Sequence, residues 1–157
     1  MDDQKFFESL RDMAGEGLKL WESPSVSVGV VKDGKTVFCG GFGLRDVEKN
    51  LPADGETLYQ IGSCSKAFTA ALVAILVDQG KLDWDKPVIE YLPWIRFMDP
   101  FTTYHATTRD LLCHRTGLPR HEYSWYGTDF DKATLVHNLR YLEPNQPIRT
   151  KFQYNIQ

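Results

Sequence analysis

The sequence predicts a single α+β domain over residues 1–157, and two hydrophobic patterns carry that prediction. Residues 26–30 alternate between valine and small residues, which is typical of a half-buried β-strand. Residues 70–77 are all apolar, which predicts a helix that is hydrophobic nearly all round and therefore buried. With 42% hydrophobic residues in 157, the chain has enough apolar material for one core.

The first third of the chain predicts a helix followed by a β-hairpin. Helical spacing relates five apolar residues, Phe6, Leu10, Met13, Ala14 and Leu18. Asp33-Gly34 then predicts a type I′ turn between the first strand and a return strand over Thr36–Phe42. The stretch Cys39–Gly43 does not have the third glycine, the spacing or the following helix of a phosphate-binding loop. It indicates instead a strand end that neighbouring backbone approaches closely.

The remaining chain predicts loops and short helices. Residues 44–61 are rich in turn formers, and Gly80 is expected to end the apolar helix. Aspartate and proline in residues 83–87 predict the start of a short helix that ends near Pro93. Two more capped helices are expected, over Thr107–His114 and from Asp131 to Leu142.

Charge and composition exclude several classes of function. The net charge is −3, so there is no electrostatic case for nucleic acid or an anionic membrane as a partner. The acidic N-terminus is no secretory signal, which predicts a cytoplasmic protein unless a signal has been removed. The three cysteines are odd in number and widely spaced, which suits a reducing compartment. No cofactor or metal is expected, because the four histidines follow no metal-ligand spacing.

The head of the apolar helix predicts a reactive site. Ser63 and Lys66 are three residues apart, so both side chains lie on one helical face. A hydroxyl beside an amine is a credible nucleophile and base. The positive helix end would favour an anion at Ser63 and disfavour a proton on Lys66, and burial would also favour a neutral Lys66. Taken alone, Ser63 is also an acceptable helix N-cap, and Lys66 alone would be a solvated lysine.

These residues resemble the serine β-lactamase and penicillin-binding protein superfamily, nearest to its class C β-lactamase-like branch of esterases and D-peptidases. The motif is Ser63-Cys64-Ser65-Lys66. Three further stretches resemble the same branch, namely Ser25–Gly43, Thr107–Pro119 and Pro147–Asn155. The resemblance spans nearly the whole chain and implies a β-lactamase/transpeptidase-like fold. The chain would contribute the N-terminal helix, the hairpin and a helical region, and strands beyond this chain would complete the sheet.

The resemblance implies a serine acyl hydrolase. Ser63 would attack an amide, β-lactam or ester carbonyl, with Lys66 as base or proton relay and Tyr154 as a second proton carrier. The Ser63 backbone N–H would form half of an oxyanion hole. The acyl-Ser63 intermediate would then be released to water, and the partner would be a small-molecule or peptide substrate.

Two departures from the family pattern leave an alternative open. The family has an asparagine two positions after the tyrosine, whereas this chain has Ile156, so Asn155 is the candidate substrate contact. The third family motif, a Lys/His-Thr/Ser-Gly stretch, lies beyond the chain. These departures motivate the alternative of a catalytically silent penicillin-binding or sensor protein. They also predict that missing C-terminal polypeptide is needed to complete the fold.

Overall fold

A computed structural model describes residues 3–155. The described residues form two compact units, one up to Ile61 and one from Gly62 onward. The single domain over residues 1–157 stays a prediction.

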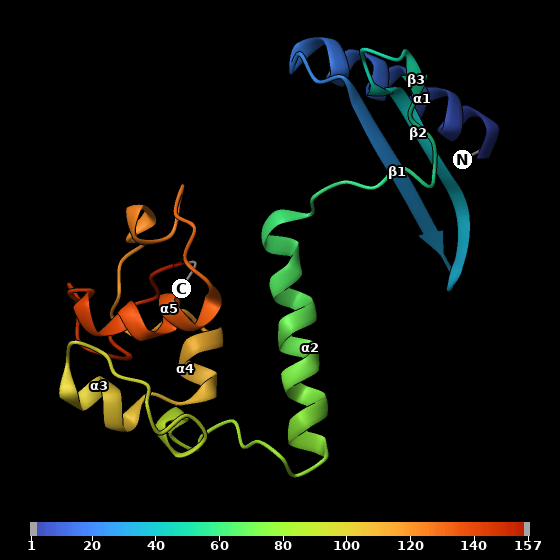
Figure 1. The fold of residues 1–157 in the computed structure, drawn as a ribbon. Coiled ribbons are helices and arrows are strands. Elements are labelled where there is room, and N and C mark those ends of the chain that lie inside the picture. The colour runs from blue at the N-terminus through green and yellow to red at the C-terminus, as the bar shows by residue number, and fades with distance from the viewer. Residues whose placement is uncertain (1–2, 156–157) are drawn as a thin grey trace. The chain divides into compact units, whose positions relative to one another are not determined.

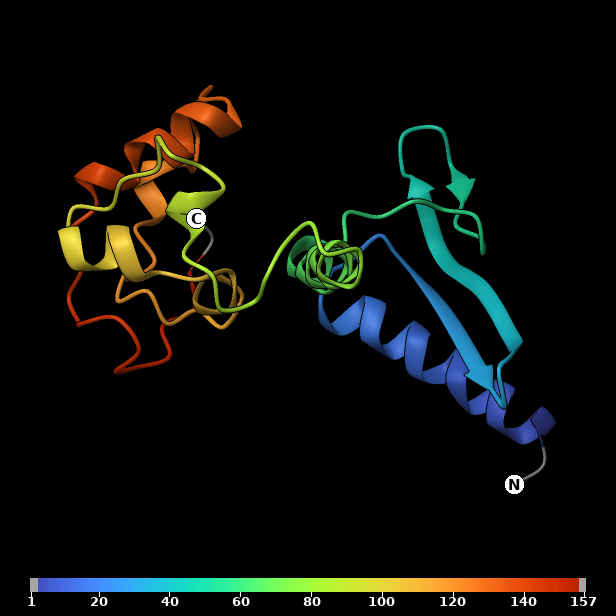
Figure 2. The ribbon, with the colours of Figure 1, turned by 90° about the horizontal axis from the view of Figure 1, so that it is seen from below.

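The first unit is a helix laid along a β-hairpin. Helix α1 (Asp3–Leu20) precedes strands β1 (Ser25–Lys32) and β2 (Lys35–Asp46), which pair antiparallel. Both ribbon views show α1 running beside the hairpin (Figures 1 and 2). The ring of Phe7, which is not part of the predicted stripe, stacks on that of Phe38 with centroids 5.4 Å apart. Leu18 of the stripe also faces β2, since a Cβ built at Gly43 would lie 3.1 Å from Leu18 Cδ1, whereas Met13 of the stripe is 66% exposed.

The hairpin turn has the predicted geometry. Asp33 and Gly34 adopt φ angles of +50° and +73°, which are the two positive values that a type I′ turn needs. Lys32 and Lys35 are the pair that flanks the turn. The local sequence is sufficient here because Asp-Gly tolerates this backbone at little cost.

Residues 44–61 are mostly turns and loop, as their turn formers indicate, but the sheet extends into them. Strand β2 continues to Asp46, and a two-residue strand β3 (Leu51–Pro52) pairs with it. Asn50 at φ +52° reverses the chain between them. Pro52 lacks an N–H, and it fits because β3 lies at the edge of the three-stranded order β1-β2-β3.

The glycines of β2 admit neighbouring backbone, as predicted, but they lie within the strand and not at its end. A Cβ at Gly41 would lie 2.4 Å from backbone atoms of Ala53 and Asp54, and one at Gly43 would lie 2.2 Å from the Pro24 carbonyl oxygen. These residues therefore form a close backbone crossing and not a phosphate-binding loop.

The second unit begins with the apolar helix. Helix α2 (Ser65–Asp78) follows a 3₁₀ turn over Gly62–Cys64 and ends before Gly80, which has φ +66° as expected of a helix stop. The prediction that α2 is buried is wrong, because the helix has no buried residue. Phe68, Leu72 and Ile75 are 66%, 63% and 51% exposed. An all-apolar helix is buried only where other elements cover it, and the core of this unit forms elsewhere.

That core joins segments far apart in the sequence. Its buried members are Val88, Ile95, Phe97, Ala106, Leu118, Leu139 and Ile148. They come from loops and from the ends of short helices, which Figure 1 shows gathered around α3 (Pro100–His105), α4 (Thr108–Leu112) and α5 (Lys132–Asn138).

Side-chain caps define these short helices. The Thr107 hydroxyl accepts from the Asp110 N–H, and the Asp110 carboxylate accepts from the Thr107 N–H at 2.9 Å, which is a complete capping box. Asp131 caps α5 by accepting from the Thr134 N–H at 2.7 Å. Both helices start at the predicted caps. Helix α3, which Asp99 caps, was not predicted.

The predicted helix over residues 83–93 is largely absent. Only a 3₁₀ turn over Val88–Glu90 forms. Pro87 pairs with Thr107, and the Val88 N–H donates to the Ala106 carbonyl at 2.8 Å. Before this pairing the chain bends at residues 84–86, and Asp83 accepts from the Asp85 N–H there.

Within residues 3–155, none of the helices is both long enough and apolar enough to cross a membrane.

Candidate active site

In the second unit, the side chains of Lys66 and Tyr154 meet at the hydroxyl oxygen of Ser63. Lys66 Nζ lies 3.3 Å from Ser63 Oγ, and the Tyr154 hydroxyl donates a hydrogen bond to the same Oγ. Lys66 Nζ also lies 5.1 Å from the centroid of the Tyr154 ring. The structure thus brings together the three residues predicted as nucleophile, base and second proton carrier, although Ser63 and Tyr154 are 91 positions apart.

Local backbone places Ser63 ahead of the helix. Gly62, at φ +52°, begins the 3₁₀ turn that carries Ser63, and α2 starts two residues later. The N-cap position belongs to Cys64, which makes no side-chain cap bond. Ser63 is therefore not the helix N-cap, and its hydroxyl is free to face Lys66 and Tyr154.

The site is more open than the sequence predicted. Ser63 is exposed and Lys66 is only partly buried in the described structure. The burial expected of Lys66 is therefore only partial, because α2 itself is uncovered.

Tyr154 is held by a segment that runs beside the loop after α4. Hydrogen bonds that join the two stretches include Arg149 N to Arg115 O (2.7 Å), Gln153 N to His114 O (2.8 Å), Gln153 Nε2 to Gly117 O (3.0 Å) and Asn155 Nδ2 to Leu118 O (3.3 Å). We name residues 149–155 the tyrosine segment. Because both flanking residues of Tyr154 are bonded, its backbone is fixed while the side chain projects to Ser63.

A buried carboxylate anchors the start of the tyrosine segment. Asp110 is 0% exposed and accepts from Arg115 Nε at 2.5 Å and from Arg149 Nη2 at 2.8 Å. Burial alone would raise the pKa of Asp110, but hydrogen bonds from Arg149, Thr107 and Arg115 outweigh it and hold that pKa well below its usual range. Asp110 therefore stays charged and ties α4 to the tyrosine segment.

His114 supports Tyr154 from a second side. Its ring centroid lies 4.7 Å from that of Tyr154 and 5.7 Å from that of Phe152. Its Nδ1 accepts from the Asn155 N–H at 3.4 Å, and its backbone is left-handed at φ +53°. The sequence does not predict this support, because nothing near His114 in the chain indicates a partner 40 positions away.

Asn155, the candidate substrate contact, has a structural partner. It is 5% exposed, and its side-chain amide donates to the Leu118 carbonyl. Its role toward substrate stays a prediction. Ile156, which replaces the family asparagine, lies outside the described residues.

Electrostatics at the site act on Tyr154. Its pKa lies below the usual tyrosine value, first because of the hydrogen bond with Ser63 and then because of the Lys66 ammonium, with a smaller contribution from Arg120. A lowered pKa raises the fraction of phenolate, the form of Tyr154 that can accept a proton, near neutral pH.

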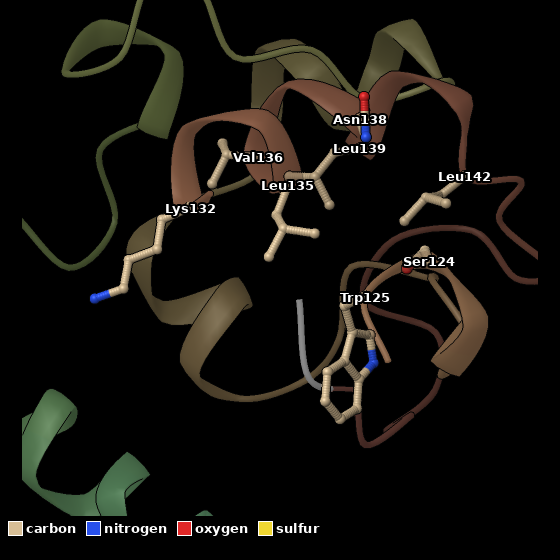
Figure 3. A pocket seen from close by; sticks show the side chains of 8 residues that line it. All are labelled: Ser124, Trp125, Lys132, Leu135, Val136, Asn138, Leu139 and Leu142. Atoms are coloured by element: carbon tan, nitrogen blue, oxygen red, sulfur yellow. The ribbon is translucent and has the colours of Figure 1, made fainter. Parts of the chain in front are cut away.

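A separate apolar cavity of about 260 Å³ lies against α5. Its lining residues are Ser124, Trp125, Lys132, Leu135, Val136, Asn138, Leu139 and Leu142. Figure 3 shows Leu135 pointing toward the Trp125 ring, while the Lys132 amine extends away. No predicted site residue lines this cavity, so it is distinct from the Ser63 group. The described part of the chain also holds no cluster of three or more His, Cys, Asp or Glu residues that could bind a metal.

Comparison with known sequences identifies relatives of this chain. A profile of the Beta-lactamase family matches residues 17–156. An unguisins hydrolase of Aspergillus campestris is 36% identical over 168 aligned residues, which cover 98% of this chain and 29% of that protein. The chain spans less than a third of the length of the curated relatives that it matches.

Solved structures of penicillin-binding protein and β-lactamase relatives share the fold of this chain. The octameric penicillin-binding protein homologue from Pyrococcus abyssi superposes with a TM-score of 0.79 at 28% identity, over 99% of this chain and 36% of that one. A class C β-lactamase superposes with a TM-score of 0.81 at 24% identity, over 99% of this chain and 42% of that one. Nearly the whole chain therefore matches less than half of each fold.

Proposed function

Because the chain belongs to the Beta-lactamase family, we propose that it carries the nucleophile and proton carriers of a serine acyl hydrolase acting on an amide, β-lactam or ester carbonyl. The α+β fold predicted from the resemblance is confirmed by the superpositions. The observation that carries the activity is the convergence of Lys66 and Tyr154 on Ser63 Oγ.

The proposed reaction begins with attack of Ser63 Oγ on the substrate carbonyl carbon. A serine hydroxyl is a weak nucleophile until a neighbour accepts its proton. In the described geometry Tyr154 donates to Oγ and Lys66 Nζ lies within hydrogen-bond distance of the same atom. One of these two groups must therefore lose a proton before it can act as base. The lowered pKa of Tyr154 supports the phenolate as acceptor, with the Lys66 ammonium as its counter-ion.

Proton transfer then completes both half-reactions. The proton taken from Ser63 passes to the leaving amine or alcohol as its bond to the carbonyl carbon breaks, which leaves an acyl ester on Oγ. Water attacks that ester, gives one proton to the same acceptor and releases the acid, and Oγ recovers its proton. The Ser63 N–H is proposed as one oxyanion donor.

The complete site is proposed to need further polypeptide. The chain corresponds to 36% and 42% of the superposed structures, and α2 exposes apolar side chains that a full fold would cover. The third family motif would come from that remainder, and Asn155 would supply the substrate contact of the family asparagine. We also propose a cytoplasmic location, which three free cysteines support.

Active-site labelling tests the proposal in the full-length protein. A fluorophosphonate probe should modify Ser63. Ser63→Ala should abolish labelling because it removes the reacting hydroxyl, and it should leave the protein folded because it removes little packing. Ser65→Ala is the matched control, since Ser65 is exposed two positions away and should leave labelling intact. A label that peptide mapping places on Ser65 or Ser124 would overturn the assignment.

The same preparation separates an enzyme from a silent binding protein. Hydrolysis of a short-chain nitrophenyl ester with repeated turnover supports the hydrolase. A stable acyl adduct on Ser63, seen by mass spectrometry without turnover, would identify a penicillin-binding or sensor protein instead.

A further inference from the structure

We propose that Arg120 is a positioning residue for Tyr154 and that the Arg120 guanidinium stabilises the phenolate form of the Tyr154 side chain. The inference rests on the proposed function of Tyr154 as a proton carrier, and it concerns a residue that neither the motif nor the charge pattern singles out.

The geometry places a second cation on the Tyr154 ring. The Arg120 guanidinium carbon lies 5.9 Å from the ring centroid, and Lys66 Nζ lies 5.1 Å from it. Both are within the range of a cation–π contact. Two positive charges beside one phenol favour its anion more than one alone, because each adds an attractive Coulomb term.

Other charged or titratable groups facing Tyr154 do not replace this effect. Among the described residues, Tyr154 also contacts the Ser63 hydroxyl and the His114 ring, whose Nδ1 accepts from the Asn155 N–H. Glu122 pairs with the Arg120 guanidinium and partly neutralises it. The effect of Arg120 is accordingly smaller than that of an unopposed charge.

The loop that carries Arg120 is anchored on both sides. On one side the Leu118 carbonyl accepts from the Asn155 side-chain amide at 3.3 Å, and on the other the His121 ring contacts the Glu143 carbonyl at 2.9 Å. The His121 carbonyl accepts from the Ser124 hydroxyl at 2.7 Å, and His121 is left-handed at φ +42°. These contacts hold the backbone beside Arg120, so its side chain approaches Tyr154 from a fixed origin.

The test measures the ionisation of Tyr154 directly in the full-length protein. Tyrosine labelled with ¹³C at Cζ reports each phenol by NMR, and Tyr154→Phe assigns the signal. Arg120→Gln should raise the Tyr154 titration midpoint by about half a pH unit, given a half-exposed charge at this distance. Arg120→Lys should restore most of the shift, because it keeps the charge.

The control is Arg140→Gln. The Arg140 guanidinium donates to the carbonyls of His137 and Trp94 and not to the Tyr154 ring, so this substitution removes an arginine charge away from Tyr154. It should leave the Tyr154 midpoint unchanged. An equal midpoint in wild type and Arg120→Gln, or an equal rise in Arg140→Gln, would overturn the inference.

Ester hydrolysis against pH distinguishes this inference from the proposed function. Below the midpoint, Arg120→Gln should acylate about threefold more slowly, because the phenolate fraction falls by that factor. If wild type shows no acylation while the NMR midpoint shifts as expected, the hydrolase proposal fails and the role of Arg120 stands.

Discussion

Ser63 Oγ accepts a hydrogen bond from the Tyr154 hydroxyl and lies 3.3 Å from Lys66 Nζ, so the Ser63 hydroxyl proton must point away from both groups. In this resting arrangement neither Tyr154 nor Lys66 can accept that proton until it loses one itself. The rate of acylation should therefore rise with pH until one of the two groups is deprotonated. The lowered pKa of Tyr154 sets the direction: the rise should occur below the usual titration range of tyrosine.

Lys66→Ala should reduce acylation by several orders of magnitude. The amine supports both Ser63 and Tyr154, and residues that act as a unit lose far more than independent ones. Single-turnover acylation by a nitrophenyl ester measures the loss. A variant that kept more than about a tenth of the wild-type rate would give Lys66 a structural role.

Tyr154→Phe should cost less, on the order of the 10²–10⁴-fold that is typical of general acid–base help. The change deletes only the hydroxyl and keeps the ring contacts with His114. Unchanged thermal stability together with reduced acylation would mark a chemical role. An unchanged acylation rate would remove Tyr154 from the mechanism.

At the scale of elements, the sequence predicted what is encoded locally. The Asp33-Gly34 turn and the Thr107 capping box form as expected because their own side chains and φ angles decide them. The helix over residues 83–93 was misassigned, since pairing of Pro87 with Thr107 is a long-range contact. The burial of α2 was misjudged because burial depends on covering elements and not on the helix itself.

The site shows the same division. Ser63 and Lys66 could be predicted from a three-residue spacing, and Tyr154 from the family motif. The supports of Tyr154, namely Asp110, His114 and Arg120, could not, because each acts across a loop that only the fold brings close.

Gly117→Ala should strongly destabilise the tyrosine segment. Gly117 has φ +88°, and a Cβ there would lie 2.1 Å from the Gln146 carbonyl oxygen. Strain of this kind costs about 1–3 kcal/mol in the free energy of unfolding, and the clash adds to it. Gly127→Ala is the matched control, because Gly127 has φ +72° and no atom within 4 Å of its Cβ position.

Urea unfolding of the full-length protein compares the two variants. Gly127→Ala should lose only the backbone term of about 1–2 kcal/mol, and Gly117→Ala should lose more and also slow acylation at Ser63. Equal losses of unfolding free energy in the two variants would show that the Gln146 carbonyl moves aside without a measurable free-energy cost.

At the scale of the whole molecule, Asp110 should make stability depend on pH. Its pKa is lowered in the folded state, so its contribution is complete above the unfolded carboxyl value of about 4 and is lost as pH falls below it. Asp110→Asn should remove that dependence and cost about 2 kcal/mol at pH 7 through weaker hydrogen bonds to Arg115 and Arg149. Urea midpoints from pH 7 to pH 3 measure both effects. A steeper acid loss in Asp110→Asn than in wild type would contradict the assignment.

The exposed face of α2 predicts how residues 1–157 behave when they are expressed alone. Phe68, Leu72 and Ile75 are all more than half exposed, and large exposed apolar patches in a lone chain promote aggregation. The described sheet has only three strands, one of them two residues long, which is marginal for independent stability. We expect this span alone to bind a hydrophobic dye, to lack a cooperative thermal transition and to be inactive toward esters and β-lactams. Substituting Leu72 and Ile75 with glutamate should reduce dye binding without restoring activity, since it covers nothing at Ser63. A cooperative transition with measurable turnover from the isolated span would show instead that these residues suffice to close the site.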